Sequence, residues 1–242
     1  MAAQKFKDPV DIDKWLGKAR SRIYRVGVEL EGGWDKLPQK GVVIVHDGSV
    51  RFPGKIVDYI GEIPSPALEV SALPRWMGIF HPQHVNETCG MHVHMSFMSA
   101  LCYARLMRPE YPATIIKYVE KWARAEELPA AHPIWDRLAG KSRFCQHVFH
   151  ADEQVSTVRK DHDQQRPGHR YTVMNYCFNT NGTMECRLLP MMEKAEQSIR
   201  AVQEIINITN AFLVVTAQKE KKVKVAIDED SKPMRESSVV VV

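Results

Sequence analysis

Apolar and polar residues alternate in three separate stretches of the chain, and each stretch predicts a β-strand with one buried face. In YRVGVELE, residues 24–31, the even positions are apolar, and the opposite face carries Arg25, Gly27, Glu29 and Glu31. In GMHVHMSF, residues 90–97, the opposite face carries Gly90, His92, His94 and Ser96. In TMECRL, residues 183–188, it carries Thr183, Glu185 and Arg187.

The remaining patterns predict an α+β fold. Strands are expected over about 22–31, 42–50 and 56–64, at 90–97, and as a pair near 170–189. Helices are expected over 8–22, 98–108, about 112–127 and about 193–219. Residues 1–219 are predicted to form a single domain, and the densely charged segment 220–242 a disordered tail. The polar segment 152–169 is predicted to be a loop, and loops of this length are often lids.

Composition is typical of a globular protein, because 44% of the 242 residues are hydrophobic. The 33 basic and 29 acidic residues are mixed along the chain, so a nucleic-acid partner is not indicated. The five cysteines have no C-x-x-C spacing, which favours a reducing compartment. No stretch approaches the roughly 18 apolar residues of a membrane span, so we expect no membrane association and a cytoplasmic location.

The polar faces of the three strands can be interpreted in two ways. Each face taken alone is what an antiparallel sheet presents to solvent. Together they hold acids and imidazoles beside glycines, and a sheet curved around a cavity would gather them. Carboxylates suit a hard cation such as Mg²⁺, and an imidazole shifts the preference towards Mn²⁺. This interpretation makes Glu29 and Glu31 metal ligands, and GEIPSPALEV adds Glu62 and Glu69.

Between residues 22 and 190 the chain carries six motifs, GVELEG, DGSV, GEIPSP, CGMHVHMS, RYTVMN and GTMECRL. In the order and spacing of these motifs it resembles the amidoligase family. That family lies within the glutamine synthetase and glutamate–cysteine ligase-like carboxylate–amine ligases. The resemblance implies a glutamine synthetase-like catalytic fold, in which a curved, mostly antiparallel sheet with helices packed on one face holds ATP and divalent cations. It also implies that ATP phosphorylates a carboxylate and that an amine then attacks the acyl phosphate to form an amide.

The resemblance also implies roles for individual residues. The metal ligands would be Glu29, Glu31, Glu62, Glu69, His92 and Glu185. The nucleotide or substrate would be bound by Asp47, Ser49, Arg170, Asn175 and Arg187. Arg187 would contact the transferring phosphate or the substrate carboxylate. Either His94 or Glu31 would accept the proton of the amine.

The residue types agree with this chemistry, because joining two anions requires charge neutralisation and positioning. A lid over 152–169 would protect the acyl phosphate from water, and Arg159, Lys160 and Arg166 in it would meet phosphates unless the segment is a solvated loop. The acid and the amine are small molecules or parts of a peptide or protein. Two other hypotheses stay open. One is a metal-dependent hydrolase that uses the His-x-His and acidic cluster, and the other is an inactive binding protein of the same fold.

Overall fold

The computed structural model describes residues 6–147, 171–177 and 182–230. They form an α+β fold around one five-stranded sheet, in which every pair of neighbouring strands is antiparallel. The strands are β1 (Ile23–Trp34), β2 (Tyr59–Pro64), β3 (Gly90–Phe97), β4 (Met174–Cys177) and β5 (Thr183–Pro190), in the spatial order β2-β1-β3-β5-β4. The predicted α+β class and the mostly antiparallel sheet are therefore confirmed.

The three alternating stretches form the central strands β1, β3 and β5. Their apolar positions point into the core, where Val28, Val93 and Cys186 are almost completely buried. Val93 lies opposite Val28 on one side and opposite Cys186 on the other. Since side chains alternate along a strand, the polar positions of all three strands must share the opposite face.

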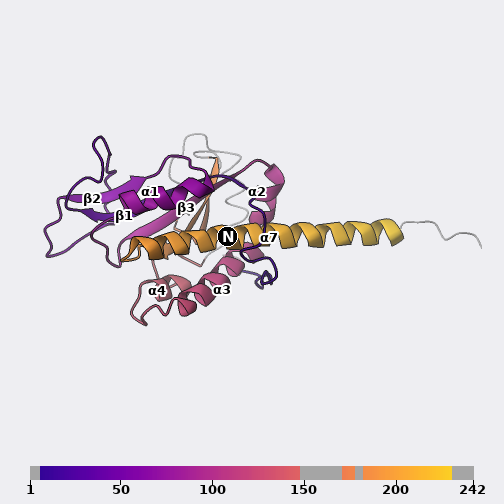
Figure 1. The fold of residues 1–242 in the computed structure, drawn as a ribbon. Coiled ribbons are helices and arrows are strands. Elements are labelled where there is room, and N and C mark those ends of the chain that lie inside the picture. Colours follow the sequence, from indigo (N-terminus) through magenta and orange to yellow (C-terminus); the bar gives the residue numbers. More distant parts are fainter. Residues whose placement is uncertain (1–5, 148–170, 178–181, 231–242) are drawn as a thin grey trace, which may run out of the picture.

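The described helices are the 3-10 turn η1 (Val70–Ala72), α1 (Leu73–Phe80), α2 (Ala100–Leu106), α3 (Glu110–Ala125), α4 (Ile134–Leu138) and α7 (Ala195–Asp230). Figure 1 shows α7 crossing the whole molecule, with α1 on one side of it and α3 and α4 on the other. The yellow end of α7 extends beyond the other elements. Among the described residues, we find no helix with both the length and the apolar character needed to cross a bilayer.

The first half of α7 is anchored in the core. Phe212 is completely buried, and its ring centroid lies 5.0 Å from that of Tyr111 in α3. The hydroxyl of Tyr111 shares a 2.7 Å hydrogen bond with that of Thr209. The helix was predicted to end at Lys219 but continues to Asp230, so residues 220–230 of the predicted disordered tail are helical, and residues 231–242 lie outside the described residues.

Several predicted boundaries differ from the structure. Residues 13–18 form turns instead of a helix, and Gly17 has a φ of +69°, a left-handed conformation that does not continue a helix. Residues 42–50 form no strand, and only Val45 pairs with Glu62. Helices α1 and α4 were not predicted, because each is too short to show a clear period.

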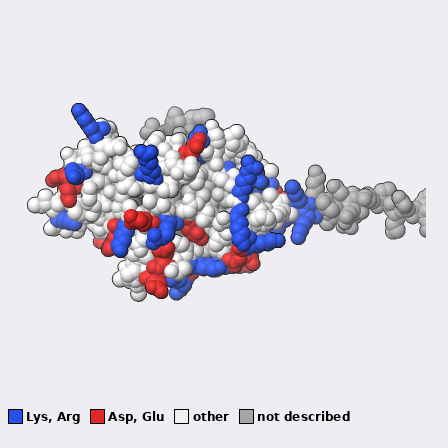
Figure 2. All heavy atoms as spheres, viewed as in Figure 1, with Lys and Arg blue, Asp and Glu red and all other residues white. Residues whose placement is uncertain are grey.

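The face of the molecule seen in Figure 2 carries both charges. Basic and acidic side chains lie next to one another over much of it. Ion pairs among the described residues include Arg200 with Glu126 at 2.7 Å and Arg105 with Glu220 at 2.7 Å. This surface agrees with the mixed charge along the sequence.

The anchoring of α7 can be tested with Phe212→Ala. Removing a fully buried aromatic ring leaves a cavity, so we expect the free energy of unfolding to fall by about 3–5 kcal/mol. Urea denaturation monitored by circular dichroism measures it. Lys222→Ala on the exposed part of the same helix is the control, and its effect should stay within about 0.5 kcal/mol. Equal effects of the two substitutions would contradict the packing.

Candidate active site

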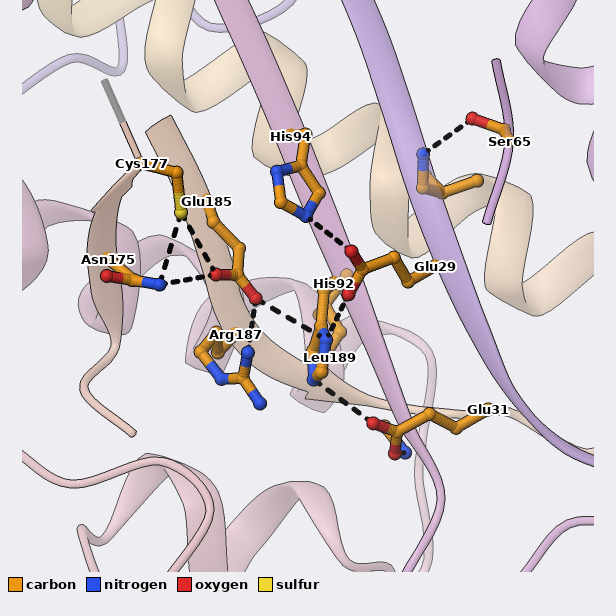
Figure 3. Close-up of polar contacts among 12 residues, drawn as sticks. Glu29, Glu31, Ser65, His92, His94, Asn175, Cys177, Glu185, Arg187 and Leu189 are labelled. Atoms are coloured by element: carbon orange, nitrogen blue, oxygen red, sulfur yellow. Dashed lines mark hydrogen bonds and ion pairs between the residues drawn. The ribbon is translucent and has the colours of Figure 1, made fainter. Parts of the chain in front are cut away.

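The strand register brings the polar positions of all five strands onto one face of the sheet. The cross-strand pairs are Glu31 with Glu62, Glu29 with His92, His94 with Glu185, and Glu185 with Asn175. Figure 3 shows most of these side chains pointing toward one another above the sheet. Residues far apart in the sequence therefore meet because of the pairing alone.

His92 lies between three carboxylates. Its Nδ1 is 2.9 Å from Oε2 of Glu29 and 3.4 Å from Oε1 of Glu185, and its Nε2 is 3.5 Å from Oε1 of Glu31. Glu29, His92 and Glu185 each offer a ligand atom, and these atoms lie within 4.8 Å of one another. We call these three residues the central group. Two carboxylates and one imidazole suit Mg²⁺ or Mn²⁺.

A second group consists of Glu31, Asp47 and Glu62, whose ligand atoms are also within 4.8 Å of one another. We call it the outer group. Asp47 comes from the loop that pairs with Glu62 through Val45. The Ser49 amide donates a 2.7 Å hydrogen bond to Asp47, which fixes that carboxylate. Asp47, predicted to lie near the substrate, thus joins the acids predicted to bind metal.

Positive and polar groups compensate the buried acids of the central group. The guanidinium of Arg187 donates to Oε1 of Glu185, and the amide of Asn175 donates to Oε2 at 2.7 Å. Burial opposes ionisation of Glu185, but Arg187 and the two histidines outweigh it and lower its pKa. Burial likewise opposes ionisation of Glu29, but its histidine contacts hold its pKa well below the usual range.

In the outer group the negative charges outweigh the positive ones. Burial, followed by the negative charges of Glu29, Glu31 and Asp47, raises the pKa of Glu62 to about 7. Like charges at close range disfavour the ionised form unless a cation joins them. The outer group therefore has the charge imbalance that a bound divalent cation would relieve.

Gly90 lies where the two groups meet. Its amide donates to Oε2 of Glu31. A Cβ at this position would lie 2.9 Å from Glu31 Oε2, 3.0 Å from His92 Nε2 and 3.3 Å from Arg137 Nη2. Only glycine leaves these ligand atoms in place, so the local backbone fits a cation site.

Arg137 in α4 is a site residue that the sequence analysis missed. It is only 2% exposed, and its Nη1 donates to the carbonyl oxygens of Arg187 at 2.9 Å and Leu189 at 3.2 Å. The β3–β5 register shifts at this point, between Met91 and Val93. Bulges of this kind redirect side chains next to functional sites. Arg137 therefore supports the backbone that aims Arg187 at the central group. The sequence held one weak signal for this helix, because Ile134 and Leu138 are four residues apart and would lie on the same face of a helix that also carries Arg137.

His94 connects the central group to a cleft of about 440 Å³. Its Nδ1 contacts the hydroxyl of Thr183 at 3.1 Å, and its Nε2 lies 3.2 Å from Oε1 of Glu29. This Nε2 is buried and forms no aligned hydrogen bond with any described residue. Of the two residues predicted to accept a proton, His94 lines the cleft, whereas Glu31 is 3% exposed and held by Gly90.

Glu69 was predicted to bind metal, but the structure does not bring it to either group. Its side chain is 68% exposed, and its Oε1 lies 3.5 Å from Nη1 of Arg25. The chain leaves β2 at Pro64, and Leu68 pairs with Val26, so the strand alternation that places Glu62 does not extend to Glu69.

The predicted lid over 152–169 and the predicted nucleotide contact Arg170 lie outside the described residues. Asn175 is brought to Glu185, as described above, and Ser49 contacts the outer group through its backbone. Comparison with protein-family models, with curated proteins and with solved structures finds no match to this chain.

The outer group can be tested with Glu62→Gln. Because the folded-state pKa of Glu62 is above its ordinary value of 4.5, the folded protein loses stability as the pH rises from about 4.5 to about 7. Removing this charge should therefore stabilise the cation-free protein at pH 8 by about 1 kcal/mol, or roughly 2–4 °C in melting temperature. The gain should shrink towards pH 5.

Melting curves in EDTA measure this gain, and curves with added Mn²⁺ should show that Glu62→Gln gains less stability from the cation than the natural protein. Glu69→Gln is the matched control, because Glu69 is exposed and lies outside both groups. A loss of stability in EDTA for Glu62→Gln would contradict the charge imbalance of the outer group, and equal Mn²⁺ effects in the two variants would show that Glu62 does not help to bind a cation.

Proposed function

We propose that this protein is an ATP-dependent carboxylate–amine ligase that forms an amide through an acyl phosphate. The observation that carries the proposal is the meeting of two acidic groups on one sheet face, with Arg187 beside them. We also propose a glutamine synthetase-like catalytic fold for the sheet, with ATP and the acid substrate bound on the polar face. The motif order described above supports both proposals.

The two groups fit Mg²⁺ or Mn²⁺, and bound cations would neutralise the triphosphate and the carboxylate that receives the phosphoryl group. The central group would hold one cation through Glu29, His92 and Glu185, and the outer group another through Glu31, Asp47 and Glu62. The γ-phosphoryl group would move to a carboxylate oxygen as ADP leaves. The amine nitrogen would then bond to the acyl carbon as phosphate leaves and the amine gives up a proton.

The surroundings of Arg187 support a role in holding an anionic oxygen during this transfer. One of its nitrogens donates to Glu185, which fixes the guanidinium. Its Nε is buried and has no hydrogen-bond partner among the described residues. A buried guanidinium nitrogen without a partner is costly, so a phosphate or carboxylate oxygen would satisfy it.

The hydrolase hypothesis is less well supported by this arrangement. Activating a water molecule needs a metal and few further charges. Here five acids form two groups on one face, and a guanidinium lies next to one of them. This amount of charge suits a reaction between anions.

All five cysteines are free thiols, which supports a cytoplasmic location.

Product balance separates ligase from hydrolase. With a panel of carboxylic acids, ATP and Mg²⁺, hydroxylamine should trap the acyl phosphate as a hydroxamate, with one ADP released for each hydroxamate. The ferric chloride colour reaction detects the hydroxamate, and a coupled assay detects ADP. Cleavage of amides or esters at full rate without nucleotide would replace the ligase proposal with the hydrolase.

Glu185→Gln and Arg187→Lys should fail in different ways. Glu185→Gln removes a charge from the central group, so half-maximal activity should require more Mn²⁺, and excess Mn²⁺ should restore part of the rate. Arg187→Lys keeps the charge but loses the planar fork, so the rate of phosphoryl transfer should fall by roughly 100-fold, and added metal should not restore it.

Arg200→Lys is the matched control for Arg187→Lys, because Arg200 makes an exposed two-pronged ion pair with Glu126 away from the site. It should leave turnover unchanged. Normal turnover and unchanged metal dependence in both Glu185→Gln and Arg187→Lys would remove β5 from the active site.

A further inference from the structure

Gly27 is the exception among the glycines of the described strands. A Cβ on Gly32, Gly33, Gly61 or Gly90 would come within 3.0 Å of another atom, so packing requires glycine there. A Cβ on Gly27 would meet nothing closer than the Ser65 hydroxyl oxygen at 3.5 Å, which is ordinary contact. The backbone of Gly27 is also not left-handed. Glycine in the middle of a strand weakens it, and such a residue often marks a place where a ligand approaches.

The cleft lies over Gly27. On the polar face of β1, Gly27 stands between Arg25 and Glu29, and all three residues line the cleft. His94 of β3 lies directly opposite Gly27, and the segment with Ser65 forms the other wall. Ser65 is fixed to β1, since its hydroxyl accepts a hydrogen bond from the Val28 amide at 2.9 Å and its amide donates to the Val28 carbonyl at 2.8 Å. The cleft is therefore preformed, and its volume suits a small molecule.

The two ends of the cleft have opposite charges. At the inner end, Oε1 of Glu29 lies beside His94. At the outer end, the Arg25 guanidinium stacks on the Tyr24 ring, with its Cζ 4.6 Å from the ring centroid. The partner of Arg25 is Glu69, 3.5 Å away and largely exposed, and an exposed ion pair of this kind contributes little and is easily exchanged.

We propose that this cleft binds the amine substrate of the ligase, that this substrate is an amine whose chain ends in a carboxylate, and that Gly27 keeps the cleft open for that chain. The amine would lie at Glu29, next to the central group, and the carboxylate would bind Arg25. ATP and the acid substrate carry no ammonium group to place beside Glu29 at the inner end of the cleft. This inference rests on the proposed function, because the inner end of the cleft meets the candidate metal site.

The experiment uses the full chain with Mg²⁺ and a non-hydrolysable ATP analogue. Calorimetry measures binding of ω-amino acids from glycine to 8-aminooctanoate, with hexylamine as the probe without a carboxylate. We expect affinity to rise with chain length until the amine and the carboxylate reach both ends, and the best ω-amino acid to bind at least tenfold more tightly than hexylamine. No binding of any ω-amino acid to a protein that binds the nucleotide and Mg²⁺ overturns the inference. Failure to bind the nucleotide and Mg²⁺ counts against the proposed function instead.

Two substitutions locate the ligand. Gly27→Val fills the cleft, so it should weaken binding of the best ω-amino acid at least tenfold while nucleotide affinity stays within twofold. In Gly27→Ala the added Cβ makes only ordinary contacts, so the melting temperature should equal or exceed that of the natural protein. Its affinity for the best ω-amino acid should still fall. This variant therefore separates loss of binding from loss of folding. Arg25→Gln should abolish the preference for a carboxylate, and Arg20→Gln, at an exposed arginine outside the cleft lining, should not. Unchanged ω-amino acid affinity in Gly27→Val and Gly27→Ala would place the ligand elsewhere and overturn the inference.

Discussion

Carboxylates cannot be buried side by side unless positive charge is buried with them, and this constraint governs the whole polar face of the sheet. Glu31 and Glu185 are each 3% exposed, and Glu29 lies between two histidines. The chain supplies part of the compensation itself, through Arg187 beside Glu185 and the buried Arg137 next to β5. The compensation is better in the central group than in the outer group, where the pKa of Glu62 is raised to about 7. The fold thus keeps an unbalanced negative charge at one place, which is costly for the cation-free protein and useful only if a cation binds there.

Placing these charges requires departures from a regular sheet. The β3–β5 register shifts next to His92, and Arg137 satisfies the two carbonyl oxygens that face α4 at this irregularity. Gly90 lets the Glu31 carboxylate approach the backbone, where any side chain would displace it. Each departure weakens the sheet locally, but it fixes the position of a charged group. The apolar face compensates for this loss, because β1, β3 and β5 bury nearly all of their apolar side chains against the helices.

The sequence was most informative where the physical rule is local. Side-chain alternation on β1, β3 and β5 requires only neighbouring residues, and it correctly placed Glu29, His92 and Glu185 on one face. Glu69 was expected at the site from the motif GEIPSPALEV and not from alternation, and the structure instead carries it past the end of β2 at Pro64 to an exposed position beside Arg25. Arg137 was missed since its role depends on α4 packing against β5, a contact between segments about 50 residues apart. The reason for each glycine also requires the structure. Only the neighbouring atoms show that a side chain would collide at Gly90 and would find space at Gly27.

The two acidic groups are not independent, since both begin on β1. Glu29 belongs to the central group and Glu31 to the outer group, and two positions along a strand are separated by only about 7 Å. His92 contacts both residues, through Nδ1 and Nε2 respectively, so its imidazole links the groups electrostatically. The other acids come from different elements, Glu62 from the edge strand β2, Glu185 from β5 on the far side of β3, and Asp47 from the loop beside β2. A change on β1 or at His92 must therefore alter both groups, whereas a change at Glu62 or Glu185 acts first on one. The cleft opens beside Glu29, so a ligand in it meets the central group first, and its influence on the outer group must pass through β1 or His92.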